Sequence, residues 1–146
     1  MDSDVATKLE QDPRKALDFA KTFQREGKYD EALEMYEWFH FNSLRCRRSL
    51  YGVRLSFALS YWMKLAEVYP KARQRLIEIR EAEIEKIKKD GLEFENFHDV
   101  ISISRALKED SVTIHVFKWI DNSGSEVAKT AKCFDAAFEI LVDHEE

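Results

Sequence analysis

Hydrophobic residues recur along this chain at intervals of three and four, the spacing that places them on one side of an α-helix. The first such stripe follows Asp12 and Pro13 and ends before Gly27, and a second begins near Asp30. Aspartate caps helix starts, proline is tolerated in a first helical turn, and glycine ends helices because it adopts positive φ at little cost. The pattern therefore predicts two helices joined by a short turn at 27–29.

Further helices are predicted beyond residue 48. One is expected to run without a break from about Ser49 to Val68, and it is apolar around most of its circumference, which is typical of a helix packed between neighbours. Pro70 opens a long amphipathic helix that Gly91 ends. The segment NFHD at 96–99 resembles a capping box, so the next helix is expected to begin there.

The segment VTIHVF at 112–117 is the one place where a β-strand competes with a helix, because β-branched residues favour strands. We favour a helix, since no second strand-like segment could pair with it. A last helix is expected at 125–143, where Phe134, Phe138 and Leu141 would cover the end of the molecule. The chain is thus predicted to be all-α, with about seven helices in a single domain spanning 1–146.

Composition excludes several classes of protein. The 146 residues include 4 glycines and 2 prolines, too few for the many turns of a β-sandwich or barrel. A formal net charge of -5 disfavours a general nucleic-acid binder. The acidic N-terminus is no signal peptide and no apolar run approaches the ~18 residues of a membrane span, so we expect a cytoplasmic protein. Cys46 and Cys133 form no CxxC pair and are expected to be reduced thiols.

Motifs for catalysis are missing from the sequence. The 4 histidines have no metal-ligand spacing, the glycines form no phosphate loop, and no nucleophile motif occurs. We therefore expect a non-enzymatic protein with no catalytic residues, no metal site and no cofactor.

Two helix–turn–helix junctions repeat the same residues. A tyrosine precedes an alanine by three positions in GKYDEAL at 27–33 and again in EVYPKAR at 67–73, so that Ala72 follows Ala32 by 40 residues. A weaker copy, KEDSVTI at 108–114, places Thr113 a further 41 residues along. The chain therefore divides into repeat-like units at about 13–45, 49–90 and 95–121.

The first unit, AKTFQREGKYDEALEMYEWF, resembles the tetratricopeptide repeat family through Ala20, Phe23, Gly27, Tyr29, Ala32 and Tyr36. In that family the small residues let two helices approach closely, and the tyrosine fills the remaining gap. The period here exceeds the family's value of about 34 residues, and the later units keep less of the pattern, with Ser60 in place of Ala20 and Thr113 in place of Ala32. The resemblance implies a right-handed array of antiparallel helix pairs. The segments WFH and YGVRLSFALSYW also resemble uncharacterised bacterial helical proteins.

The resemblance implies a binding surface as well, because the family binds peptides on a concave side lined by the first helix of each repeat. The corresponding positions are Arg14, Leu17, Lys21 and Gln24 in the first unit, Arg54, Phe57, Tyr61 and Lys64 in the second, and Glu95, His98, Ser102 and Arg105 in the third. This lining is mostly cationic in an acidic protein, which suggests an acidic peptide or a C-terminal carboxylate as ligand. The hypothesis is a protein–protein interaction module whose partner-binding residues are Arg14, Lys21, Arg54, Phe57, Tyr61, Lys64, His98 and Arg105.

A basic patch leaves two interpretations open. Arg45, Arg47 and Arg48 lie beside aromatic residues and could bind phosphates or carboxylates. Alternatively, they cap the carboxyl end of the preceding helix and pair with local glutamates.

Two other functions also stay open, as does the oligomeric state. The glutamate-rich helix at 70–90 could belong to an immunity or antitoxin-like protein that masks a basic partner. His40, Tyr61 and Trp62 could surround a small-ligand pocket in a helical bundle. Nothing in the sequence decides between a monomer and a homodimer.

Overall fold

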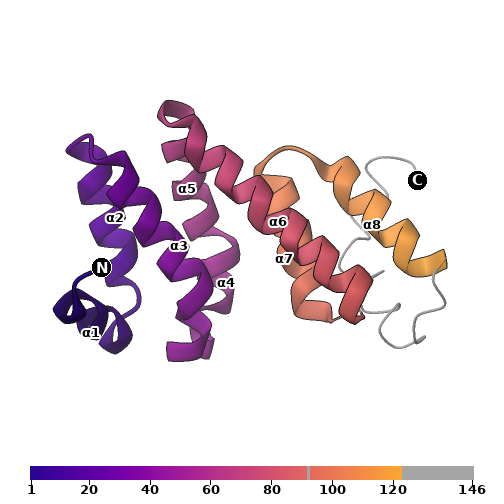
Figure 1. Ribbon diagram of the computed structural model, residues 1–146, viewed down its shortest axis with the longest axis horizontal. Helices are drawn as coiled ribbons and strands as arrows, with labels where there is room; N and C mark the ends of the chain where they lie inside the picture. The colour runs from indigo at the N-terminus through magenta and orange to yellow at the C-terminus, as the bar shows by residue number, and fades with distance from the viewer. Residues whose placement is uncertain (92, 123–146) are drawn as a thin grey trace. The chain divides into compact units, whose positions relative to one another are not determined.

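The computed structural model describes residues 1–91 and 93–122, in which every regular element is a helix (Figure 1). The expected all-α class is confirmed for this part of the chain. Two compact units divide the chain, residues 1–74 and residues 75–146, and the boundary falls inside one long helix. The expectation of one domain over 1–146 stays a prediction, and the helix expected at 125–143 lies outside the described residues.

The first unit is built around a helical hairpin. Its elements are α1 (Ser3–Gln11), α2 (Lys15–Arg25), α3 (Tyr29–Cys46), the short 3-10 helix η1 (Arg48–Leu50), α4 (Tyr51–Leu55) and α5 (Phe57–Val68), followed by the start of α6 (Pro70–Asp90). Figure 1 shows α2 and α3 side by side, with α5 on the other side of α3. The residues predicted for the hydrophobic stripes of α2 and α3 are buried here, among them Ala16, Leu17, Ala20, Leu33 and Phe39.

Gly27 sets the turn between α2 and α3. Its φ of 76° lies in the left-handed region, where glycine carries no side-chain penalty. The Lys28 N–H donates to the Phe23 carbonyl at 2.8 Å, and the Gly27 N–H donates to the Gln24 carbonyl at 3.1 Å. These two bonds form a Schellman motif, so the helix end predicted at Gly27 is confirmed.

α1 is the helix that the sequence pattern did not predict. It begins at Ser3, and the Asp2 carboxylate caps it by accepting a 2.8 Å hydrogen bond from the Asp4 N–H. Leu9 is the one residue of α1 that is buried. A helix that buries so little apolar surface produces no clear hydrophobic period, which explains the omission.

The continuous helix predicted from Ser49 to Val68 is wrong. The chain forms η1 and α4, breaks at Ser56, and resumes as α5. Ser56 has φ −124° and ψ −86°, and its Oγ donates to the Gly52 carbonyl at 2.7 Å. Such a side-chain bond competes with the backbone ladder of a helix, so the break has a local cause.

The second unit holds the rest of α6 together with α7 (Phe94–Ala106) and α8 (Asp110–Asn122). The three helices share a core of Ile84, Ile87, Phe97, Val100, Ile101, Ile114, Val116, Phe117 and Ile120. Buried Arg80 on α6 places its Nη1 2.6 Å from the Glu109 carboxylate, in the turn between α7 and α8. The helix predicted over 112–117 is confirmed. The capping box is wrong, because α7 already begins at Phe94 and Asn96 lies inside it.

The three aligned small residues of the repeat occupy equivalent places. Ala32, Ala72 and Thr113 are all 0% exposed, and each lies in the first turn of its helix. The tyrosines that precede the two alanines also meet, since the rings of Tyr29 and Tyr69 lie 5.6 Å apart. Small buried residues at this point allow the helix backbones to approach closely.

Tyr69 also joins the α5–α6 turn to the start of α3. Its hydroxyl donates a hydrogen bond to the Asp30 carboxylate, which lies 3.7 Å from the Lys71 ammonium group. The hydrogen bond from Tyr69 holds the pKa of Asp30 below its ordinary value, and the same bond raises the pKa of Tyr69. The two helix–turn–helix junctions of the first unit are therefore in direct contact.

Candidate functional site

An open hollow on the first unit gathers tyrosine and basic side chains. It encloses about 460 Å³ and is lined by Lys21, Gln24 and Arg25 of α2, Tyr29 and Tyr36 of α3, and Tyr61, Lys64 and Val68 of α5. We call it the tyrosine–lysine hollow. None of these lining residues is acidic, although the chain carries a net charge of -5.

Helical spacing brings these residues to one place. Lys21 and Arg25 are four residues apart on α2, and Tyr61 and Lys64 are three apart on α5, so each pair shares one side of its helix. Tyr29 and Tyr36 are seven residues apart on α3 and share a side for the same reason. Packing of α2 and α5 against α3 then closes the three sides of the hollow.

Two ammonium groups face the ring of Tyr61. The Nζ of Lys21 lies 3.7 Å from the ring centroid, and the Nζ of Lys64 lies 5.8 Å from it. Both distances fall within the range of a cation–π interaction. Neither ammonium group forms an ion pair with a carboxylate in the described part of the chain. Two positive charges are thus held at the hollow, and no carboxylate among the described residues pairs with them.

Tyr36 forms the buried floor of the hollow. It is 2% exposed, its ring stacks on Trp62 with centroids 6.1 Å apart, and its hydroxyl donates to the Gln24 Oε1 at 3.3 Å. Burial, with a smaller contribution from Tyr61, raises the pKa of Tyr36 to about 12. The hydroxyl therefore stays protonated near neutral pH and remains a hydrogen-bond donor.

The chemistry of the lining suits the binding of an anion. Lysine and arginine form charge-assisted hydrogen bonds with carboxylates and phosphates. The tyrosine rings offer apolar surface with a polar edge, which suits the flanking parts of a peptide. None of the lining residues is a histidine, cysteine, serine, aspartate or glutamate.

The structure brings together part of the predicted partner-binding set. Lys21, Tyr61 and Lys64 meet in the tyrosine–lysine hollow. Arg14 precedes α2 and is exposed outside the lining, and Phe57 is 62% exposed at the start of α5. His98 and Arg105 lie on α7, in the second unit.

Arg54 is buried, in contrast to the exposed position that we predicted for it. It is 8% exposed, its Nε donates to the His40 backbone carbonyl at 2.7 Å, and its Nη2 lies 3.1 Å from the His40 Nε2. These contacts tie α4 to α3. The helix breaks at Ser56, between Arg54 and Tyr61, so the chain does not form the continuous helix that would place Arg54 on one side with Tyr61 and Lys64.

The basic patch makes contacts with α1. Arg45 places its Nη2 3.3 Å from the Glu10 Oε1, and Arg47 donates to the Gln11 carbonyl at 3.4 Å. Arg45, Arg47 and Arg48 are all exposed. Glu10 lies 35 residues before Arg45, so this pair is not the local glutamate pairing of the second interpretation. The carbonyl that Arg47 reaches belongs to α1 and not to the preceding helix.

His40 and Trp62 are packed in the interior. They are 4% and 1% exposed, and their rings meet edge to face with centroids 6.3 Å apart. Of the three residues considered for a small-ligand pocket, only Tyr61 lines the tyrosine–lysine hollow.

Sequence reasoning missed four lining residues of the hollow, namely Arg25, Tyr29, Tyr36 and Val68. In the sequence, Tyr29 and Tyr36 match packing positions of the repeat, which does not indicate that they line a hollow. The spacing of Lys21 and Arg25 was a usable signal, since two cations one helical turn apart share a side. The position of Val68 carried no signal, because which side of α5 is exposed depends on its neighbours.

The described residues contain no group of three or more histidine, cysteine, aspartate or glutamate side chains placed to hold a metal ion. None of the described helices combines the length and the apolar character needed to cross a membrane. Comparisons with protein-family models, with curated proteins and with solved structures gave no match to this chain.

Proposed function

We propose that this protein is a non-enzymatic interaction module with a tetratricopeptide-like arrangement, which binds an acidic segment of a partner protein in the tyrosine–lysine hollow. The observation that carries the proposal is the pair of lysines on Tyr61, whose Nζ atoms lie 3.7 and 5.8 Å from the ring centroid. The two like charges repel each other, and no carboxylate within residues 1–91 and 93–122 pairs with either lysine. An incoming anion removes this repulsion.

The binding step follows from elementary electrostatics. A ligand carboxylate attracts the ammonium groups of Lys21 and Lys64 and replaces cation–π contacts with charge-assisted hydrogen bonds. Arg25 adds a third positive charge on the same side of α2 as Lys21. Because the hollow is open and two of its cations are exposed, salt is expected to weaken binding.

The tetratricopeptide-like arrangement has its own support. Helical hairpins recur, and each begins its second helix with a small residue that is fully buried, at Ala32, Ala72 and Thr113. The spacings of 40 and 41 residues place these hairpins at a regular period. The hollow lies on the sides of α2 and α5, the helices that line the concave surface in the family.

Fluorescence anisotropy with labelled ten-residue peptides tests the proposal. The probes are an Asp- and Glu-rich peptide with a free C-terminus, the same peptide amidated, and a lysine-rich peptide of equal length. We expect the acidic peptides to bind and the basic one not to bind. A preference for the free C-terminus would identify the terminal carboxylate as the ligand group.

A pair of charge reversals locates the site. Lys21→Glu with Lys64→Glu is expected to weaken binding of the acidic peptide at least tenfold, which corresponds to about 1.4 kcal/mol. The matched control is Lys8→Glu with Lys15→Glu, which changes the net charge equally at exposed positions outside the hollow. Equal weakening in both pairs, or equal binding of acidic and basic peptides, would contradict the proposal.

A further inference from the structure

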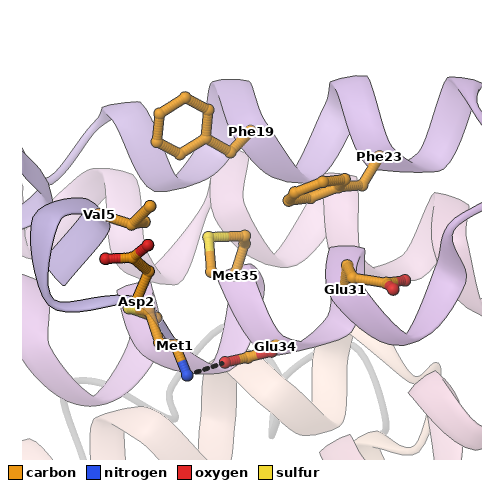
Figure 2. A pocket seen from close by; sticks show the side chains of 8 residues that line it. All are labelled: Met1, Asp2, Val5, Phe19, Phe23, Glu31, Glu34 and Met35. Atoms are coloured by element: carbon orange, nitrogen blue, oxygen red, sulfur yellow. Dashed lines mark ion pairs between the residues drawn. The ribbon is translucent and has the colours of Figure 1, made fainter.

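A second hollow on the first unit is apolar and has an acidic edge. It encloses about 230 Å³ and is lined by Met1, Asp2, Val5, Phe19, Phe23, Glu31, Glu34 and Met35. Figure 2 shows Phe19 and Phe23 of α2 facing Met35 of α3, while Glu31 and Glu34 lie along the α3 edge. We call it the apolar hollow. Its open apolar lining marks it as a surface for an apolar side chain.

An outer stripe of α3 runs beside the apolar hollow. It consists of Glu31, Glu34, Trp38, Phe41 and Arg45, which alternate at intervals of three and four residues. This is the heptad spacing with which two helices pack against each other. Phe41 is 55% exposed and Trp38 is half-buried, so two aromatic rings lie at the centre of the stripe. We call these five residues the α3 stripe.

The charges of the α3 stripe would complement those of a second copy of the stripe that runs in the opposite direction. The stripe begins with two glutamates and ends with an arginine. A second copy running antiparallel, with Trp38 opposite the partner's Trp38, would place Glu31 opposite the partner's Arg45. A parallel copy would place like charges opposite each other. Antiparallel pairing is therefore the arrangement that the charge pattern favours.

The same register gives the apolar hollow an occupant. With Trp38 at the centre, Phe41 of one copy comes opposite the partner's Glu34 and Met35, and both of these line the apolar hollow. A two-fold axis would therefore form this contact twice, with the exposed Phe41 of each copy at the apolar hollow of the other. Symmetric pairs of this kind are the commonest form of protein oligomer.

We infer that two copies of this chain form a two-fold symmetric dimer along the α3 stripe, in which Phe41 of each copy enters the partner's apolar hollow and Glu31 pairs with the partner's Arg45. Arg45 already lies 3.3 Å from Glu10 on its own chain, but a guanidinium group has five donors and can serve two carboxylates. Glu34 lies 3.7 Å from the N-terminal ammonium group (Figure 2), so Glu31 is the more available acid.

The dimer is independent of the proposed peptide binding. The tyrosine–lysine hollow shares no residue with the α3 stripe and none with the apolar hollow. Failure of one proposal therefore leaves the other intact, and each has its own measurement.

Sedimentation equilibrium of the full chain tests the dimer. We expect a mass that rises toward twice that of the monomer with increasing concentration. Phe41→Ser should weaken association at least tenfold. At a concentration low enough for both proteins to be monomeric, its thermal unfolding curve should match that of the wild type, because this side chain is exposed. A single-chain mass at all concentrations up to about 1 mM would overturn the inference, since even a Kd of that size would be visible.

Charge reversal tests the register. Glu31→Arg alone and Arg45→Glu alone should each weaken association, because each homodimer then holds two like-charge contacts. An equimolar mixture of these two variants should associate again, because both contacts of the mixed dimer join opposite charges. Lys15→Glu, an exposed reversal on α2, serves as the control and should not change association. Unchanged association in both single variants, or a mixture that does not recover, would rule out this pairing.

Discussion

The indole N–H of Trp62 donates a hydrogen bond of 2.8 Å to the backbone carbonyl of Ala72. Trp62 is 1% exposed, and its ring stacks against Tyr36 of α3. One side chain therefore joins α5 to the first turn of α6 and to the floor of the tyrosine–lysine hollow. Ala72 is also the second of the aligned small residues and is 0% exposed, so this bond is made at a fully buried position.

Replacing this tryptophan should destabilise the first unit. We expect Trp62→Phe to lower the free energy of unfolding by about 2–4 kcal/mol, because it removes buried ring volume and a buried hydrogen bond. Urea denaturation followed by circular dichroism measures the change. Trp119→Phe, at a position 39% exposed, is the control and should change stability by no more than about 0.5 kcal/mol. Equal effects of the two substitutions would contradict the role assigned to Trp62.

The same change of charge should affect stability strongly at Arg54 and only slightly at Lys64. Arg54→Glu places a carboxylate against the His40 carbonyl in a buried position, and we expect it to destabilise the protein by about 3–5 kcal/mol. Lys64→Glu is exposed and should alter stability by about 0.5 kcal/mol or less. Thermal unfolding of the two variants distinguishes them, and similar midpoints would show that Arg54 is not buried.

Lys108 adopts a conformation that glycine would adopt at lower free energy. Its φ is 60°, and the Glu109 N–H donates to the Ser104 carbonyl at 2.8 Å, the same helix-ending pattern that Gly27 forms. We expect Lys108→Gly to raise the free energy of unfolding by about 0.5–1 kcal/mol, because it removes the side-chain penalty at positive φ.

The reverse change at Gly27 is the matched control for Lys108. A Cβ at Gly27 would meet no atom within 4 Å, so Gly27→Ala tests the backbone conformation alone. It should lower the free energy of unfolding by about 1 kcal/mol. Both changes are read from urea denaturation, and substitutions that act in the same direction would contradict this interpretation of the two turns.

The stability of the protein should depend on Tyr36 at high pH. Burial raises the pKa of Tyr36 to about 12 in the folded protein, whereas an unfolded tyrosine ionises near pH ~10. Between these values the unfolded chain loses the proton more readily, so the free energy of unfolding falls as pH rises from about 10 to about 12. The contribution is fully present below pH ~10.

Tyr36→Phe isolates this effect. Denaturation of the wild type and of the variant at pH ~9 and ~11.5 should show a smaller pH-dependent loss in the variant, because phenylalanine cannot ionise. Lysine deprotonation occurs in both proteins and cancels in the comparison. Equal losses would show that Tyr36 has an ordinary pKa.

The sequence by itself determined the helical class and most helix ends. A hydrophobic period of three and four residues, a glycine at Gly27 and a proline at Pro70 act within one turn of the chain, so their effects can be predicted without knowing what lies opposite. The same holds for the burial of Ala32 and Ala72, since the repeated tyrosine–alanine spacing marks a close helix contact. The sequence pattern did not predict α1, because this helix buries one leucine and shows no hydrophobic stripe.

Tertiary structure alone decided which side chains are accessible. Arg54 and Lys64 are both cations on predicted inner positions, yet the break at Ser56 and the His40 carbonyl make one of them buried and leave the other exposed at the hollow. Tyr36 matched a packing position in the repeat but forms the floor of the candidate site. Exposure depends on which helix surfaces meet, and residues from α2, α3 and α5 that are far apart in sequence determine it together. A local pattern does not contain that information.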